Sequence, residues 1–219
     1  MTRPLEAELR AGLEKLALSL DDAQVAALLD YMALIQKWTK VYNLTAVREP
    51  RDMLTHHLLD SLAVVRPLRQ QLATFGVGPA VRVLDVGAGA GLPGVVLAIC
   101  CPEMTVHCVD TVAKKAAFVQ QVAVSLKLAN LRGVHARVES LTEPYGLVCS
   151  RAFASLTDFT QWSAAALGPA GVWMAMKGKH PDAELAALGS GVAVFHVEPL
   201  HVPGLDAERC LVWMRRGVT

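Results

Sequence analysis

The spacing of hydrophobic residues changes once along this chain, near residue 80. Between residues 3 and 72 apolar residues recur every three to four positions, which is typical of amphipathic helices. The clearest case opens at Asp21 and has its apolar face at Val25, Leu28, Leu29, Met32 and Ile35. Ser19 with Asp22 is a candidate cap for this helix. After a break at 42–45, a further helix is expected from Asp52 to Leu72, which makes three helices before any strand.

Beyond the segment from Gly76 to Pro79, short apolar runs alternate with helical segments, as in a parallel sheet covered by helices on both faces. Seven strands are predicted, at 81–86, 105–110, 132–136, 147–150, 172–176, 192–197 and 210–214. Helices are expected at 93–101, 113–128, 156–167 and 181–188. None fits between the last two strands, which should therefore pair antiparallel. We predict a doubly wound α/β fold, mostly parallel with one antiparallel edge strand, in which a helical region at 1–79 packs on a sheet domain at 80–219.

Composition narrows the class of protein. Hydrophobic residues make up 53% of the 219 positions, yet no run approaches the ~20 apolar residues that a membrane-spanning helix needs. The first residues mix acidic and basic side chains and lack the apolar core of a secretory signal, so we expect a cytoplasmic protein without membrane association. The five cysteines show neither a CxxC pair nor zinc spacing, which favours reduced thiols and no bound metal.

The net charge of +1 gives no global sign of a nucleic-acid binder. Charge is nevertheless uneven, because between Thr111 and Arg151 six basic residues stand against two acidic ones. This local excess fits a basic contact surface and ordinary solvated faces equally well.

The segment VLDVGAGAGLPG, Val83 to Gly94, carries the clearest chemical signal. An apolar strand runs directly into Gly87, Gly89 and Gly91, and a helix is predicted to follow. Glycines at such a turn allow positive φ angles and let a ligand approach the backbone. The string from Gly89 to Gly94 also satisfies the dinucleotide pattern GxGxxG, so the loop alone indicates only an adenosine-containing cofactor.

Acidic residues near this loop bear on the choice of cofactor. Asp110 ends the second predicted strand, where a carboxylate binds ribose hydroxyls in either kind of site. Asp85 precedes the first glycine by two residues, where it could hold the α-amino group of a methionine moiety and would repel a pyrophosphate; it therefore favours S-adenosylmethionine. Val138 and Glu139 could bracket an adenine ring. Arg151 closes the fourth strand, at the edge where open α/β sheets bind ligands.

Seven motifs occur in order along the chain: YNLTAVREP, the HHLLDSL run, VLDVGAGAGLPG, CVDT, the RVES run, SRAFASL and MAMKGK. Together they resemble the glucose-inhibited division protein B family, and the resemblance extends from about Leu20 to Val212. The resemblance implies a class I, Rossmann-like bacterial methyltransferase. Such an enzyme places a methyl group from S-adenosylmethionine on N7 of a guanine in 16S ribosomal RNA, free or in the small subunit. We expect it to be a monomer.

The same resemblance assigns cofactor contacts to five positions of this chain: Gly87, Leu92, Val138, Glu139 and Arg151. Asp85, Gly89 and Asp110 complete the predicted cofactor site on the strength of their positions around the loop. The departures from the family pattern are few: Ala88, Ala90, Thr111 and His56.

Guanine N7 has an in-plane lone pair and no proton, so methyl transfer to it needs neither a covalent nucleophile nor an obligatory general base. Positioning donor and acceptor at ~3 to 3.5 Å should supply the catalysis, and Arg151 is the one catalytic candidate. Cys149 is predicted to be a strand residue. His57 and Asp60 are too few for a metal site and suit a helix cap or an ion pair better. The predicted RNA contacts are Asn43, His57, Arg151 and Lys177.

Three other functions stay open on these residues. A small-molecule methyltransferase would share the fold and the donor, and only the resemblance and the local basic excess favour RNA. An NAD-dependent oxidoreductase would need a catalytic tyrosine–lysine or histidine pair that the sequence does not clearly offer. A catalytically silent RNA-binding module is disfavoured by the intact glycine loop.

Overall fold

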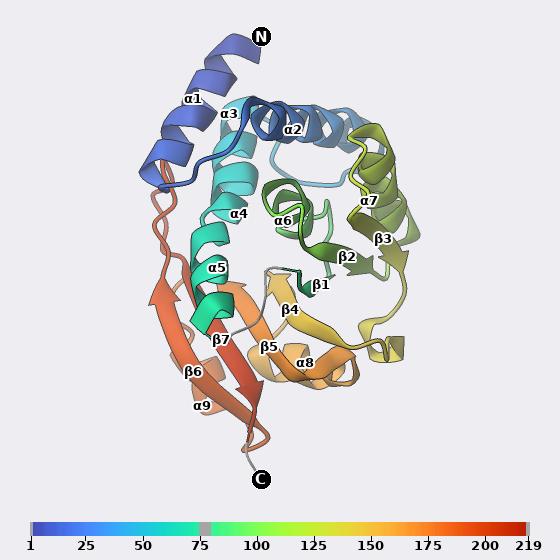
Figure 1. Cartoon of the computed structure of the whole chain (residues 1–219), viewed down its shortest axis with the longest axis vertical. Coiled ribbons are helices and arrows are strands. Elements are labelled where there is room, and N and C mark those ends of the chain that lie inside the picture. Colours follow the sequence, from blue (N-terminus) through green and yellow to red (C-terminus); the bar gives the residue numbers. More distant parts are fainter. Residues whose placement is uncertain (1, 75–79, 218–219) are drawn as a thin grey trace.

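The fold was described from a computed structural model, which covers residues 2–74 and 80–217. The predicted turn at Gly76 to Pro79, and with it the boundary expected after residue 79, lies outside these ranges. The helical region and the sheet are otherwise both described, and Figure 1 shows them as adjoining layers.

A seven-stranded sheet in the order β3-β2-β1-β4-β5-β7-β6 forms the centre of the molecule (Figure 1). Its strands are β1 (Arg82–Val86), β2 (Thr105–Asp110), β3 (Leu131–His135), β4 (Tyr145–Arg151), β5 (Leu167–Lys177), β6 (Val192–Pro199) and β7 (Cys210–Arg216). Strands β1 to β5 pair in parallel, whereas β7 pairs antiparallel with both β5 and β6. The mixed sheet with antiparallel pairing at one edge is therefore confirmed. Strand order reverses between β1 and β4, and open sheets bind ligands at such a switch point.

The helical segments before the sheet are α1 (Thr2–Lys15), α2 (Asp22–Tyr42), α3 (Pro50–Met53), the π-helical η1 (Leu54–Leu59), α4 (Asp60–Leu62) and α5 (Val65–Thr74). Those within the sheet domain are α6 (Gly94–Cys100), α7 (Ala113–Ser125), η2 (Val138–Ser140), α8 (Leu156–Trp162), η3 (Ala164–Ala166) and α9 (Asp182–Ala186).

Two details of the predicted helices are wrong. The cap of α2 is not formed by Ser19 and Asp22 but by Asp21, whose side chain accepts from the Gln24 N–H while the Gln24 side chain accepts from the Asp21 N–H. The single helix expected from residue 52 to 72 is interrupted by the π-helical stretch η1 and by a turn at 63–64. π-helical stretches are uncommon and often occur at functional sites.

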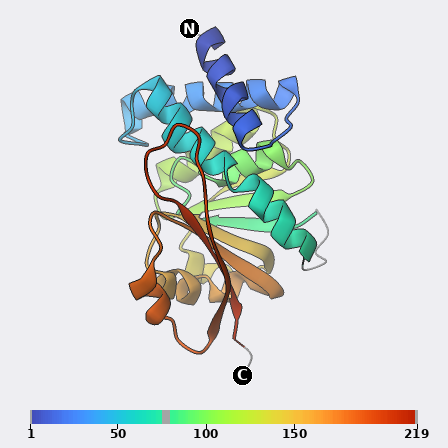
Figure 2. The same cartoon turned by 90° about the vertical axis from the view of Figure 1, so that its left-hand side faces the viewer.

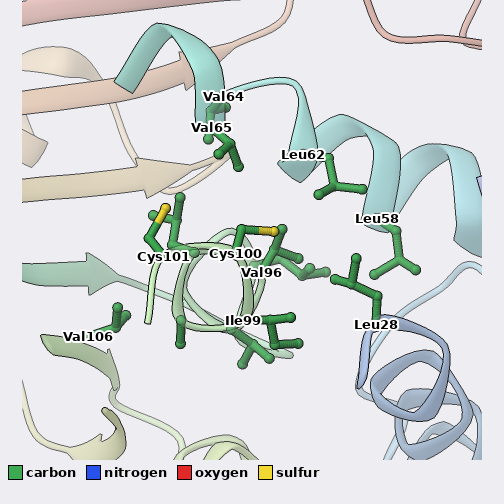
Figure 3. Close-up of a cluster of buried hydrophobic side chains, with 14 of the residues drawn as sticks. Leu28, Leu58, Leu62, Val64, Val65, Val96, Ile99, Cys100, Cys101 and Val106 are labelled. Carbon is green, nitrogen blue, oxygen red and sulfur yellow. The ribbon is translucent and has the colours of Figure 1, made fainter. Parts of the chain in front are cut away.

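Both faces of the sheet are buried, because neighbouring residues along each strand point to opposite sides. Val83 and Leu147 belong to a core shared with the N-terminal helices, α6 and α7, whereas Leu84 and Val148 pack with α8 on the other face. Helix α6 lies at the centre of the first core. Figure 3 shows Leu28 of α2 and the side chains of η1 to α5 closing around it. The helical region thus has no separate core from that face of the sheet.

The long loop between β6 and β7, 200–209, crosses the outside of the helical segment near η1 (Figure 2). Gly204 at its tip lies against Thr55 of η1. The loop therefore brings residues from far along the sequence to the end of the sheet where the glycine turn lies.

Candidate functional site

The glycine turn follows β1 and is tied to β2. Gly87 and Gly89 have φ angles of 66° and 60°, which side chains rarely adopt, and a Cβ on Gly87 would collide with the Phe153 ring. The backbone N–H of Gly87 donates to the Val109 carbonyl at 2.9 Å. The Asp110 carboxylate accepts from the Gly89 N–H at 3.0 Å, so β2 fixes the position of the turn.

A cavity of about 450 Å³, here called the Asp110 cavity, opens beside this turn. Its walls come from the ends of β1 and β2, from η2 and from α8, and include Gly87, Asp110, Lys115, Val138, Glu139 and Trp162. Val138 is buried, Glu139 is exposed and Asp110 keeps 8% of its surface exposed. The residues predicted to hold an adenosine are therefore brought together around one space with an apolar wall and a carboxylate.

A second cavity of about 530 Å³, the Arg151 cavity, lies on the other side of the turn. Its lining includes Thr45, His57, Asp60, Gly89, Leu92, Arg151, Lys177 and Arg209. Gly87 and Ala152 line both cavities, so a long ligand could lie across the turn with one end in each. Ala152 itself has a φ of 49°, an unusual conformation for alanine at the junction of two cavities.

Arg151 is held at the wall of its cavity by the N-terminal helices. Its Nη1 donates to Asp60 Oδ2 at 2.8 Å and to the His56 carbonyl at 2.9 Å. The other Asp60 oxygen accepts from Nε of Arg209, also at 2.8 Å. Both oxygens of the Asp60 carboxylate are therefore paired, although the side chain is almost fully buried at 4% exposure. The ion pair considered for Asp60 is confirmed, with arginines as partners.

His57 forms a buried part of the same wall. Its Nε2 lies 2.8 Å from the Thr45 hydroxyl, while Nδ1 has no hydrogen-bond partner among the described residues. Burial lowers the pKa of His57, and the positive charge of Arg151 lowers it further. The imidazole is therefore kept neutral, which suits hydrogen bonding to a neutral acceptor better than holding a phosphate.

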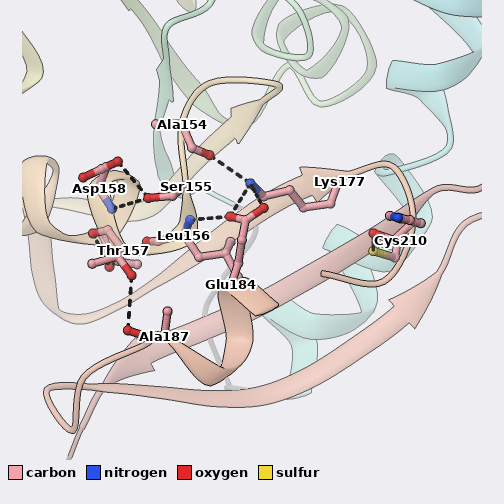
Figure 4. A network of polar contacts seen from close by, with 11 residues as sticks. Ala154, Ser155, Leu156, Thr157, Asp158, Lys177, Glu184, Ala187 and Cys210 are labelled. Carbon is pink, nitrogen blue, oxygen red and sulfur yellow. Dashed lines mark hydrogen bonds and ion pairs between the residues drawn. The ribbon is translucent and has the colours of Figure 1, made fainter. Parts of the chain in front are cut away.

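Lys177 lines the Arg151 cavity, but its ammonium group is already occupied. Nζ donates to both carboxylate oxygens of Glu184, at 3.0 and 2.8 Å, and to the Ala154 carbonyl at 2.8 Å (Figure 4). Glu184 also accepts from the Leu156 N–H. Lys177 thus holds the loop that follows β4, and its charge is neutralised by Glu184.

Asn43 lies apart from the residues above. It caps the end of α2 in a left-handed conformation with φ of 51°, and its Oδ1 accepts from Arg48 at 3.1 Å. It is exposed and is not part of the lining of either cavity. Its contact with RNA stays a prediction, for which the cavities provide no support.

Asp85 does not belong to the lining of either cavity. Its side chain is fully buried, with Oδ2 accepting from the Gly94 N–H at 2.8 Å and Oδ1 without a partner among the described residues. Burial raises the pKa of Asp85 to about 7, although the Gly94 N–H opposes the rise. This geometry does not support the direct contact expected with a methionine amino group. Asp85 instead joins β1 to the first turn of α6.

Several residues of the site were not found from the sequence. Arg209, Lys115 and Trp162 line the cavities without belonging to any of the seven motifs, and Thr45 and Phe153 lie within motifs that assign them no role. Lys115 follows the acidic strand end, 3.7 Å from Asp110, and is the one for which position in the sequence offered a hint. Arg209 could not be predicted from its position in the sequence, because packing of its loop against η1 places it at the site.

The described residues offer neither a metal site nor a membrane-spanning helix. Within residues 2–74 and 80–217 no three His, Cys, Asp or Glu side chains gather in a way that could hold a metal ion. Across the same residues, each helix is too short or too polar to cross a membrane. Cys149 is buried in β4, and burial raises the pKa of its thiol far above the ordinary value.

Comparisons with known proteins bear on this site. The family profile of GidB, rRNA small subunit methyltransferase G, matches residues 24–212. A ribosomal RNA small subunit methyltransferase G from Albidiferax ferrireducens is 69% identical to this chain, covering 98% of the chain and 99% of the relative.

Solved structures share the fold at much lower identity. TrmN from Thermus thermophilus matches with a TM-score of 0.55 at 18% identity, over 74% of this chain and 53% of that one. A SAM-dependent methyltransferase from Geobacter sulfurreducens, in complex with S-adenosyl-L-homocysteine, matches with a TM-score of 0.50 at 13% identity, over 69% of this chain and 91% of that one. The structural matches speak for the fold, and the profile and the relative for the family. The chain belongs to the rRNA small subunit methyltransferase G family.

Proposed function

We propose that this protein transfers the methyl group of S-adenosylmethionine to N7 of a guanine in 16S ribosomal RNA of the small ribosomal subunit. The observation that carries the proposal is the pair of cavities meeting at Gly87 and Ala152, at the switch point of the sheet, in a chain of this family. We further propose that the protein acts as a monomer in the cytoplasm.

The two cavities fit the two ends of the cofactor. In the Asp110 cavity the carboxylate can accept hydrogen bonds from ribose hydroxyls, and Val138 with Glu139 can bracket the adenine. The methionine end would pass Gly87 toward Leu92 and Arg151, whose guanidinium suits a carboxylate. The cofactor supplies the reactive methyl group, and the protein supplies its orientation.

The charge balance of the Arg151 cavity favours an anionic partner. Lys177 is neutralised by Glu184, and Asp60 compensates only one of its two arginines. One positive charge is left over in a partly closed space, where a carboxylate or a phosphate would be stabilised. The guanine that accepts the methyl group needs no deprotonation at N7. The neutral His57 is therefore not needed as a general base and can orient the guanine by hydrogen bonding.

The proposal is tested by incubating the protein with methyl-labelled S-adenosylmethionine and small-subunit RNA, both free and assembled into subunits, and identifying the modified nucleoside after digestion. Label in 7-methylguanosine is expected. Label in another nucleoside, or in neither substrate, would overturn the RNA assignment. Label in small molecules of a cell extract would instead identify a small-molecule methyltransferase.

Arg151→Ala provides a second test. Loss of the guanidinium should lower methyl transfer at least about 100-fold, on the order seen when a positioning group is removed. The free energy of unfolding should stay within about 2 kcal/mol of wild type, because Asp60 keeps Arg209 as a partner. Wild-type turnover by this variant would exclude Arg151 from the site.

A further inference from the structure

A third cavity, of about 450 Å³, lies beside the Arg151 cavity. The two share Gly178, just after β5, and Arg209, just before β7. We call it the β6–β7 cavity, because most of its other lining residues belong to β6, to β7 and to the loop between them. Its position makes it a continuation of the space in which methyl transfer is proposed to occur.

Arg209 is fixed at the border between the two cavities. Nε donates to the buried Asp60, and Nη1 donates to the Glu208 carbonyl at 2.8 Å. The side chain is 24% exposed, so the guanidinium is anchored on one side and open on the other. An anchored arginine loses little further side-chain entropy on binding, and its planar group is well suited to a phosphate.

The walls of the β6–β7 cavity combine apolar side chains, a ring and two oppositely charged residues, Arg209 and the exposed Glu208. Val197 and Leu200 are half-buried apolar side chains, and Pro199 extends this surface. His180, an exposed ring, also lines the cavity, and its Nδ1 lies 3.0 Å from the Asp182 carboxylate. An apolar wall, a ring and an arginine are the elements with which proteins hold an unstacked nucleotide by its base face and its phosphate.

We propose that the β6–β7 cavity receives the nucleotide next to the target guanosine, and that Arg209 contacts the phosphate joining the two. This inference rests on the proposed function, because a guanine entering the Arg151 cavity from RNA brings its neighbours with it. It adds a binding site for a second nucleotide, made by a loop 149 residues away from the Asp60 that anchors it.

The charge contact is tested with Arg209→Gln. The KM for RNA should rise about 5- to 30-fold, and the slope of the logarithm of RNA affinity against the logarithm of salt concentration should fall by about 0.7, the value for one phosphate of a single strand. The Kd for S-adenosylmethionine should change less than about twofold. Arg215→Gln, an exposed arginine of β7 outside all these cavities, is the matched control and should leave both RNA values unchanged.

The cavity itself is tested with Leu200→Trp, which fills it without changing charge and serves also if Arg209→Gln fails to fold. Two RNAs are used, each abasic at one neighbour of the target. One of them should raise the wild-type KM, and that same RNA should cause no further rise in Leu200→Trp.

The two proposals fail in distinguishable ways. If wild type forms 7-methylguanosine but neither variant changes the KM for RNA, the neighbouring-nucleotide site is wrong and the function stands. If wild type forms no 7-methylguanosine, the function fails and this inference fails with it.

Discussion

Asp60 and Arg151 form a 2.8 Å ion pair that joins the N-terminal helical segment to the end of β4. Because Asp60 is buried and Arg151 lines the Arg151 cavity, the helices determine where the guanidinium lies. We expect Asp60→Asn to raise the KM for S-adenosylmethionine about tenfold. It should also lower the free energy of unfolding by about 1 to 3 kcal/mol, less than for a fully buried pair because both arginines remain partly hydrated.

Steady-state kinetics and urea unfolding measure both effects, with Asp30→Asn on the exposed face of α2 as the control. A positioning role requires coupling, so the double variant Asp60→Asn with Arg151→Gln should lose less than the sum of the single losses. Strict additivity would mean that Asp60 acts on stability alone.

Asp85 should make stability depend on pH. Its pKa is raised from 3.8 to about 7 in the folded protein, chiefly by burial. The folded state therefore keeps a proton that the unfolded chain releases, so its stabilising effect is complete below about pH 4 and is lost as pH rises toward 7. The loss is at most about 4 kcal/mol, since one pKa unit corresponds to about 1.4 kcal/mol.

Asp85→Asn removes this titration. Urea unfolding of both proteins at several pH values from 4 to 8 should show wild type losing stability relative to the variant across that window. Other titrating groups, including His57, cancel in the difference. Parallel curves for the two proteins would show that Asp85 is not protonated in the folded state.

Gly87→Ala should damage both the fold and the cofactor site. An alanine at a φ of 66° costs about 1 to 2 kcal/mol, and its methyl group would also displace the Phe153 ring. We expect a loss of about 2 to 3 kcal/mol in unfolding free energy and at least a tenfold weaker Kd for S-adenosylmethionine by calorimetry. Gly189→Ala, with open space around its Cβ position, should leave both values unchanged.

The Lys177–Glu184 pair should act on cofactor binding through the loop after β4. Lys177→Met removes the bond to the Ala154 carbonyl, and we expect a roughly fivefold rise in the KM for S-adenosylmethionine with a smaller fall in kcat. Glu184→Gln should behave alike, and the double variant should be little worse than either single one. Lys37→Met, an exposed lysine of α2, is the control. A raised KM for RNA alone would indicate instead that Lys177 contacts the substrate.

Much of the fold was predictable because the chain changes its periodicity only where its architecture changes. All seven predicted strands are present, since buried parallel strands leave short apolar runs between helical ones. The residues that cap α2 could not be predicted from periodicity. Ser19 with Asp22 and Asp21 with Gln24 both have capping spacing, and only the structure shows which pair begins the helix.

The site was predictable where topology alone places a side chain. Gly87 follows β1, and Asp110 and Arg151 end β2 and β4 at the same edge of the sheet; all three line cavities. The cofactor contact expected of Asp85 stays a prediction, because strand alternation puts the side chain on the same face as Val83, under α6. Arg209 depends on a contact across 149 residues, which no local pattern encodes.

The position of β7 between β5 and β6 determines the order in which the sheet can be completed during synthesis. β6 is synthesised before β7, yet among the described strands its one partner is β7, which separates it from β5. During synthesis β6 therefore remains unpaired until β7 has been synthesised. Arg209 immediately precedes β7, so the same event that closes the sheet also delivers the second arginine to Asp60. A growing chain could fold most of its core early. The site around Asp60 would be completed only when β7 inserts between β5 and β6.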